Sequence, residues 1–151
     1  MNYTEDFNDA SKGEASANAM IGQDADVIFQ VAGLTGAGAL RAACAANVWG
    51  IGVDVDQHAS LPDAAECIIT SAEKKLENAI SQAIERYANE GPQGGNFFNS
   101  AENDGIGLSP FTNLDPVPEG LQEAVDDAFE KMQNDELDPC QPIDCSGPNL
   151  E

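Results

Sequence analysis

Two oppositely charged residues in this sequence follow short apolar runs, at places where strands of a sheet would end. Asp54 follows the run WGIGV, and Lys74 comes shortly after the run CIIT. If both runs are neighbouring parallel strands, their carboxyl ends share the edge where open α/β sheets bind ligands. An aspartate and a lysine there form an acceptor and a donor for vicinal hydroxyl groups, whereas a solvated Lys74 is the plainer interpretation.

The expected position of Lys74 indicates that its charge has an anionic partner. We predict that a long helix begins with Ser71 as its N-cap, which places Lys74 in the first helical turn. A cation is unfavourable there, because the N-terminus of a helix carries a partial positive charge. An anionic neighbour such as Asp54 would compensate this position.

A glycine-rich segment, GLTGAG, begins at Gly33 directly after another apolar run. It precedes an expected helix, whose N-terminal N–H groups attract polar or anionic ligands. Together with Asp54 it resembles a dinucleotide-binding fingerprint, but the G-x-G-x-x-G pattern that starts at Gly36 requires glycine where Arg41 stands. The segment therefore has three interpretations: a steric turn, a contact to a polar ligand, or a fragment of an NAD(P)-dependent oxidoreductase.

The segment DVDQH places Asp54, Asp56 and His58 at alternating positions. These residues fit a metal site, a carboxylate that accepts ligand hydroxyls, or a loop cap. The sequence contains no G-x-S-x-G, P-loop or H-E-x-x-H motif, so hydrolase and kinase chemistry has no residues to carry it. We therefore expect no catalysis, no cofactor and no metal.

The charge balance limits the partners of the chain. Its 151 residues include 27 acids and 6 bases, which gives a net charge of −21. So few bases make no basic patch for nucleic acid or for an anionic membrane surface.

The hydrophobic content of 42% argues against a disordered chain, and no run of apolar residues is long enough to span a membrane. The first residues lack the pattern of a signal peptide, which taken literally predicts a cytoplasmic protein.

The elements that must position these residues alternate between strands and helices. Strands are expected at 26–32, 49–55 and 67–70, with a helix at 37–47. Strands separated by helices of this length predict βαβ units, so the fold class is α/β with a doubly wound parallel sheet whose strands are buried on both faces. A helix at 10–21 comes first, and the first strand–helix unit of such a sheet is missing.

We predict three parts along the chain. Residues 1–91 form an α/β lobe that ends with a long amphipathic helix before Gly91-Pro92. Residues 92–138 hold a short strand, IGLSPF, and an amphipathic helix at about 119–134, whose acidic face is either solvated or an interaction surface. Residues 139–151 form a proline-rich extended tail.

Four cysteines fall into two pairs of different character. Cys44 and Cys67 lie in apolar context and are expected to be small buried hydrophobic residues. Cys140 and Cys145 bracket the segment CQPIDC, where a short disulfide, free thiols and a metal all remain open.

Five segments in register resemble the basic membrane protein family, the substrate-binding proteins of ABC importers, many of which are nucleoside receptors. They are YTEDFNDASKGEA, DVIFQVAGLTGAG, GIGVDVDQ, ITSAEKK and NDGIGLSPF, and the resemblance covers roughly residues 3–135. It implies a lobe of the type I periplasmic-binding-protein fold, truncated at its N-terminus, which binds its ligand in a cleft against a first lobe that this chain lacks. It also implies an ABC permease as partner and an extracytoplasmic, lipid-anchored parent protein.

The resemblance also implies roles for four residues. Asp54 and Lys74 match the family positions expected to bind ribose hydroxyls, and Gly33 matches a ligand-facing glycine. Phe7 matches an aromatic residue that would stack on the base of a nucleoside. Many family members have two glycines where this chain has Gly33 and Leu34, so Leu34 would narrow the site or change its ligand.

A binding protein is therefore the preferred interpretation. The oxidoreductase fragment is one alternative. The other is a free-standing lobe that senses a small metabolite and binds a partner through the acidic helix.

Overall fold

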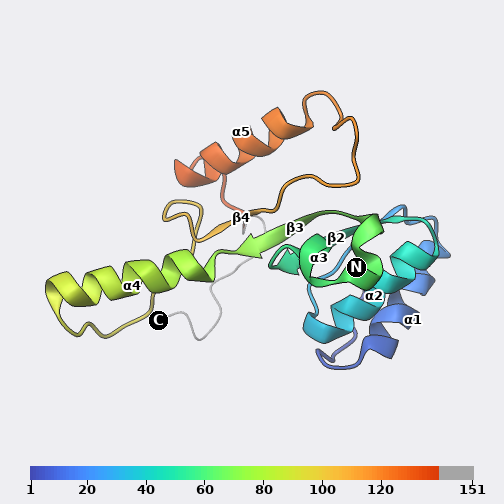
Figure 1. Cartoon of the computed structure of the whole chain (residues 1–151), viewed down its shortest axis with the longest axis horizontal. Coiled ribbons are helices and arrows are strands. Elements are labelled where there is room, and N and C mark those ends of the chain that lie inside the picture. The colour runs from blue at the N-terminus through green and yellow to red at the C-terminus, as the bar shows by residue number, and fades with distance from the viewer. Residues whose placement is uncertain (140–151) are drawn as a thin grey trace.

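The computed structural model describes residues 1–139, so Cys140, Cys145 and almost all of the expected tail lie outside the described residues. Helices and strands alternate along the chain (Figure 1). The elements are α1 (Ala10–Ile21), β1 (Val27–Phe29), α2 (Gly33–Ala45), β2 (Trp49–Asp54), α3 (Gln57–Ser60), η1 (Pro62–Cys67), β3 (Ile68–Lys74), α4 (Leu76–Glu90), β4 (Ile106–Leu108) and α5 (Leu121–Gln133).

The four strands form one sheet in the order β1-β2-β3-β4. The first two pairings are parallel, with Ile28 opposite Gly50 and Val53 opposite Ala72. The predicted α/β lobe with parallel strands is confirmed. The fourth strand runs antiparallel to β3, because the chain turns back on itself after α4.

Small residues let α1 and α2 pack closely on one face of the sheet. A side chain at Gly13 would collide with the backbone of Thr35, and one at Gly38 would collide with the backbone of Ala10. The tight crossing buries Ala17 against Ile28 of β1. A second cluster joins α2 to the start of β3, with its buried members Leu40, Ala64 and Ile68.

The other face of the sheet is open over β1 and the start of β2, although Val53 near the end of β2 is buried, and this corrects the prediction that the strands are buried on both faces. Val27, Phe29 and Trp49 are 39%, 55% and 40% exposed. Val27 pairs directly with Trp49, so these side chains lie on one face. No described element covers them, because α1 and α2 both pack on the opposite face.

The predicted boundary between β3 and α4 is wrong. Ser71 is a fully buried residue within β3 rather than a helix N-cap, and Lys74 ends the strand. The helix begins at Leu76. The strand continues past CIIT because β4 pairs with it from Ala72 to Lys74, a pairing between distant segments that local patterns do not reveal.

Residues 1–74 form what we call the N-terminal body. Two helices, α4 and α5, lie apart from it. Figure 1 shows α4 extending away from the body beyond β3, while α5 lies alongside β4. Neither α4 nor α5, the distal helices, contains a buried residue. Between them, the chain returns along β3 and bonds to it again at Thr112, whose N–H donates to Ile69 O at 2.8 Å. Within residues 1–139, no helix combines the length and apolar character that crossing a membrane demands.

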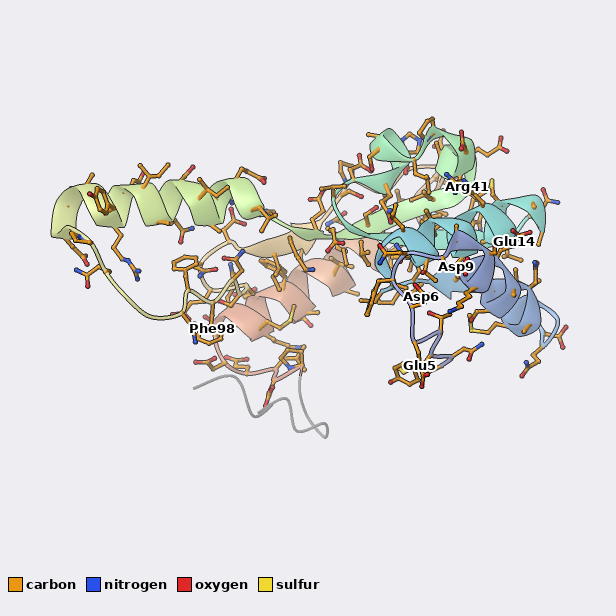
Figure 2. The ribbon with its side chains drawn as sticks, turned by 90° about the horizontal axis from the view of Figure 1, so that it is seen from below. Glu5, Asp6, Asp9, Glu14, Arg41 and Phe98 are labelled. Carbon is orange, nitrogen blue, oxygen red and sulfur yellow. A yellow bond between two sulfur atoms is a disulfide. The ribbon has the colours of Figure 1, made fainter. Side chains whose placement is uncertain are left out.

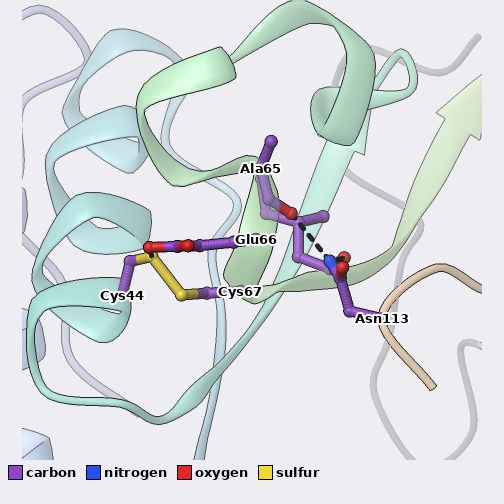
Figure 3. Close-up of a disulfide and its surroundings, with 6 residues drawn as sticks. Cys44, Ala65, Glu66, Cys67 and Asn113 are labelled. Carbon is purple, nitrogen blue, oxygen red and sulfur yellow. Dashed lines mark hydrogen bonds between the residues drawn. A yellow bond between two sulfur atoms is a disulfide. The ribbon is translucent and has the colours of Figure 1, made fainter. Parts of the chain in front are cut away.

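Cys44 and Cys67 form a disulfide, which corrects the prediction of two unpaired buried thiols. The bond ties the C-terminal end of α2 to the end of η1 (Figure 3). On the other side of η1, Asn113 Nδ2 donates to Ala65 O at 2.7 Å. Both contacts hold the segment that leads into β3.

Candidate ligand-binding edge of the sheet

The carboxyl ends of β2 and β3 bring Asp54 and Lys74 together, as the sequence predicted. Asp54 lies opposite Glu73 in the parallel register, and Lys74 follows directly. The Lys74 Nζ lies 2.7 Å from Asp54 Oδ1, with the two side chains 66% and 50% exposed. The lysine is presented by a strand instead of a helix turn. The pair is therefore an open acceptor and donor at the edge of the sheet.

Asp54 occupies a strained backbone position. Its φ is 72°, and the N–H of Val55 donates to Val53 O at 2.9 Å, which makes Asp54 the central residue of a γ-turn. A non-glycine residue rarely adopts positive φ, although aspartate tolerates it better than most. Backbone strain of this kind clusters at functional sites and orients a side chain that a regular strand would place elsewhere.

Gly33 and Phe7 lie side by side at the carboxyl end of β1. Gly33 has a φ of 56°, a conformation that favours glycine. A side chain there would begin 3.1 Å from Phe7 O and 3.6 Å from Phe7 Cβ. The N–H of Thr35 donates to Phe7 O at 3.3 Å, which holds the two segments together. The Phe7 side chain is 66% exposed, so its ring is available for contact.

Short polar contacts fix the segment that carries Phe7. Asp6 accepts a hydrogen bond from Lys12 Nζ at 2.7 Å, which lowers the pKa of Asp6 and raises that of Lys12. Asp9 caps α1, and its N–H donates to the buried Thr35 Oγ1 at 3.0 Å. Figure 2 shows Asp6 and Asp9 close together within the N-terminal body, in the segment that leads into α1. These bonds anchor both ends of the Phe7 loop.

Asp56 has the role of a cap, the third of the interpretations considered for DVDQH. Its Oδ1 accepts from the N–H of His58 at 3.0 Å at the start of α3. Among residues 1–139, the one group of histidine, cysteine or acidic side chains close enough to share an ion is Cys44, Glu66 and Cys67. Its two sulfur atoms are bonded to each other. Arg41, which broke the dinucleotide pattern, pairs with Asp63 at 3.4 Å.

Sequence reasoning missed two glutamines at this edge. Gln30 is 5% exposed, and its Nε2 donates to Gln57 Oε1 at 2.8 Å. The sequence did hold a signal for Gln30. It stands two residues after the buried Ile28, and residues two apart along a strand point to the same face of the sheet. Gln57 carried no such signal, since it follows the expected strand at 49–55 and no local pattern revealed that it is the first residue of α3.

The family model for PnrA-like ABC transporter substrate-binding proteins, named Bmp, matches residues 1–139. Basic membrane protein D of Borreliella burgdorferi is 33% identical over 116 residues, which are 74% of this chain and 33% of that protein. An ABC transporter nucleoside-binding protein of Lactococcus lactis is 44% identical over 63 residues, 36% of this chain and 18% of its own length. The chain thus spans about a third of the first of these relatives.

Solved structures agree with the fold. A solute-binding protein of an ABC transporter system from Conexibacter woesei has a TM-score of 0.72 at 28% identity, covering 91% of this chain and 44% of its own. A transcriptional activator of the comK gene from Bacillus halodurans has a TM-score of 0.79 at 18% identity, covering 91% and 47%. Because the family model matches residues 1–139, the chain belongs to the Bmp family of PnrA-like ABC transporter substrate-binding proteins.

Proposed function

We propose that this chain supplies one lobe of a receptor that binds a nucleoside, or a related ribose-containing ligand, for an ABC importer. The observation that carries the proposal is the pair of Asp54 and Lys74, 2.7 Å apart at the ends of two neighbouring parallel strands. Membership of a substrate-binding family supports a small-molecule ligand. The name of the relative from Lactococcus lactis supports a nucleoside.

The chemistry of the pair suits the two adjacent hydroxyls of a ribose. A carboxylate accepts hydrogen bonds from both hydroxyls, and an ammonium group donates to their oxygen atoms. Both side chains are half exposed or more, so a ligand reaches them without rearrangement of the body. In this proposal the exposed Phe7 ring stacks on the base, and the glycine at position 33 lets the ligand approach the backbone.

A second lobe completes the cleft in this proposal. Apolar side chains along α4 are left uncovered, with Leu76, Ile80 and Ile84 between 57% and 63% exposed. Helix α5 lines an open groove of about 740 Å³ with Val125 and Phe129. Apolar stripes of this size on otherwise acidic helices call for a packing partner. The solved relatives are more than twice as long as the matched part, which leaves room for such a lobe.

We place the division between the lobes at Lys75, earlier than the residue 91 expected from the sequence. In this arrangement α4 and α5 belong to the other lobe, and β3 and β4 form the crossing strands. Ligand binding would close the lobes around the ligand without catalysis, as hinged binding proteins do. An ABC permease would receive the closed receptor outside the cytoplasm, with a lipid anchor on the parent protein.

The test is a comparison of two aspartate substitutions in a two-lobed receptor that carries this lobe. Asp54→Ala removes a charge-assisted hydrogen bond and is expected to weaken nucleoside binding by about 1.5–3 kcal/mol, measured by calorimetry. Asp63→Ala is the matched control, because Asp63 is 68% exposed and lies in η1, before β3 rather than after it. Equal affinity of the Asp54→Ala variant and the parent would remove Asp54 from the site.

A further inference from the structure

A chain of hydrogen bonds between polar side chains crosses the sheet next to the turn that carries Asp54. Gln57 Oε1 accepts from Gln30 Nε2 at 2.8 Å and from the N–H of Val53 at 2.9 Å. The N–H of Gln57 donates to Ser71 Oγ at 3.0 Å. One glutamine thus connects the residue that follows β1, the end of β2 and the middle of β3.

The same chain continues to the segment that follows β4. The N–H of Ser71 donates to Ser109 Oγ at 2.8 Å, and Thr70 Oγ1 donates to Ser109 O at 2.7 Å. Gln30, Thr70, Ser71 and Ser109 are at most 5% exposed. Buried polar groups that are fully paired rigidify the structure around them, since each lost partner leaves an unsatisfied group.

Backbone donors fix which way both amides face. Gln30 Oε1 accepts from the N–H of Ala32 at 3.1 Å, so the nitrogen of Gln30 is the atom that meets Gln57. The oxygen of Gln57 is fixed in turn by the N–H of Val53. Neither amide can flip without leaving a backbone N–H unpaired, so the direction of the chain is set by the fold.

Two glycines make the space for these side chains. A Cβ at Gly36 would collide with the carboxamide of Gln30. A Cβ at Gly52 would lie 2.5 Å from Ser71 Oγ and 2.8 Å from Gln57 Oε1. Gly36 thus accommodates a side chain of this protein itself.

We propose that Gln57 is a positioning residue that clamps the strained γ-turn at Asp54. The turn lies between Val53, whose N–H bonds to the Gln57 side chain, and Val55, whose N–H closes the turn. Without the clamp, Asp54 would relax from its φ of 72°, and its carboxylate would move away from Lys74. The consequence for ligand affinity rests on the proposed function; the effect on the turn does not.

The first test is hydrogen exchange of the Val53 and Val55 amides in the ligand-free two-lobed receptor. Gln57→Leu removes the acceptor and should speed both amides by about tenfold or more relative to the rest of β2. Gln57→Glu keeps an acceptor oxygen and should restore slow exchange. Asn113→Ala is the control, because it removes two hydrogen bonds, to Ala65 O and Ile68 O, far along the chain from the turn.

The second test is nucleoside affinity of the same variants, measured well below their unfolding temperatures. Gln57→Leu should bind about tenfold more weakly, while Gln57→Glu and Asn113→Ala bind like the parent. If Gln57→Leu does not fold, Gln30→Met removes the donor from the other side and should show the same pattern.

Each outcome separates the two proposals. Faster exchange at Val53 and Val55 in Gln57→Leu, together with a parent protein that binds no nucleoside, would support the clamp and overturn the proposed function. Unchanged exchange in Gln57→Leu, or exchange and affinity changed equally in Asn113→Ala, would overturn the clamp.

Discussion

The N-terminal body and the distal helices differ in both sequence pattern and burial: α1 and α2 are weakly amphipathic helices rich in small residues and pack tightly, whereas the distal helices carry clear apolar stripes that stay exposed. In the body, α2 buries eight of its residues against α1 and the sheet, including Leu40 and Ala43. The distal helices bury none, although their apolar side chains recur with clear helical spacing. Figure 2 shows α4 extending from the sheet with side chains around it and no second layer. A helical stripe therefore shows that a face needs a partner, and not that the partner lies in the same chain.

The largest expected difference comes from truncating one aliphatic side chain in each region, Leu40 in the body and Ile84 in α4. Leu40→Ala leaves a cavity beside Ala64 and Ile68 and should lower the free energy of unfolding by about 3–5 kcal/mol. Ile84→Ala, at a side chain that is 63% exposed, should change it by less than about 0.5 kcal/mol in this chain. Denaturant unfolding followed by the fluorescence of Trp49, the one tryptophan, reports on the body. An equal decrease in the free energy of unfolding in both variants would contradict the difference between the two regions.

The disulfide should stabilise the body alone. The bond joins residues separated by 23 positions, so replacing both Cys44 and Cys67 by serine should lower the free energy of unfolding by about 3 kcal/mol. The same fluorescence transition measures it. A reducing agent should shift the parent to the midpoint of the double variant and leave the variant unchanged. A parent insensitive to reduction would contradict a bridge between α2 and η1.

The smallest expected effect is a loss of helix content at the start of α4 at alkaline pH. The hydrogen bond from Lys75 to Asp104, at 2.8 Å, raises the pKa of Lys75 above its ordinary value of 10.5. Because the pKa of Lys75 is higher in the folded protein, the charged lysine stabilises the fold fully below pH 10.5. This stabilisation is lost as the pH rises through the raised pKa of Lys75. Helix content measured by circular dichroism should therefore fall as the pH rises through the raised pKa of Lys75. The fall should be smaller in the Lys75→Met variant. An identical pH profile in both proteins would show that the pair does not anchor α4.

The sequence predicted the parts of the fold that depend on local pattern. Helix α1 was expected at its observed bounds, and Asp54 and Lys74 were expected at the same edge of the sheet, although Lys74 was placed in a helical turn. What it missed depends on pairing between distant segments. Ser71 has the character of an N-cap, but its partner is Ser109, which no local rule identifies.

The candidate site was predicted in the same uneven way. The residue types of Asp54 and Lys74 indicated a donor and an acceptor, and the structure brings them together. The disulfide was missed, because two cysteines in apolar context give no sign of their distance in space. Gln57 was missed because its role comes from the γ-turn, which is a property of the backbone that the sequence DVDQ does not specify.

The most direct test of the binding edge uses one nucleoside and its dideoxy analogue, which lacks both ribose hydroxyls. Calorimetry would titrate each into the two-lobed receptor and its Asp54→Ala variant. We expect the parent to prefer the nucleoside by about tenfold or more, and Asp54→Ala to remove this preference without changing the affinity for the analogue. Loss of affinity for both ligands in equal measure, or for neither, would contradict a role of Asp54 in holding ribose hydroxyls.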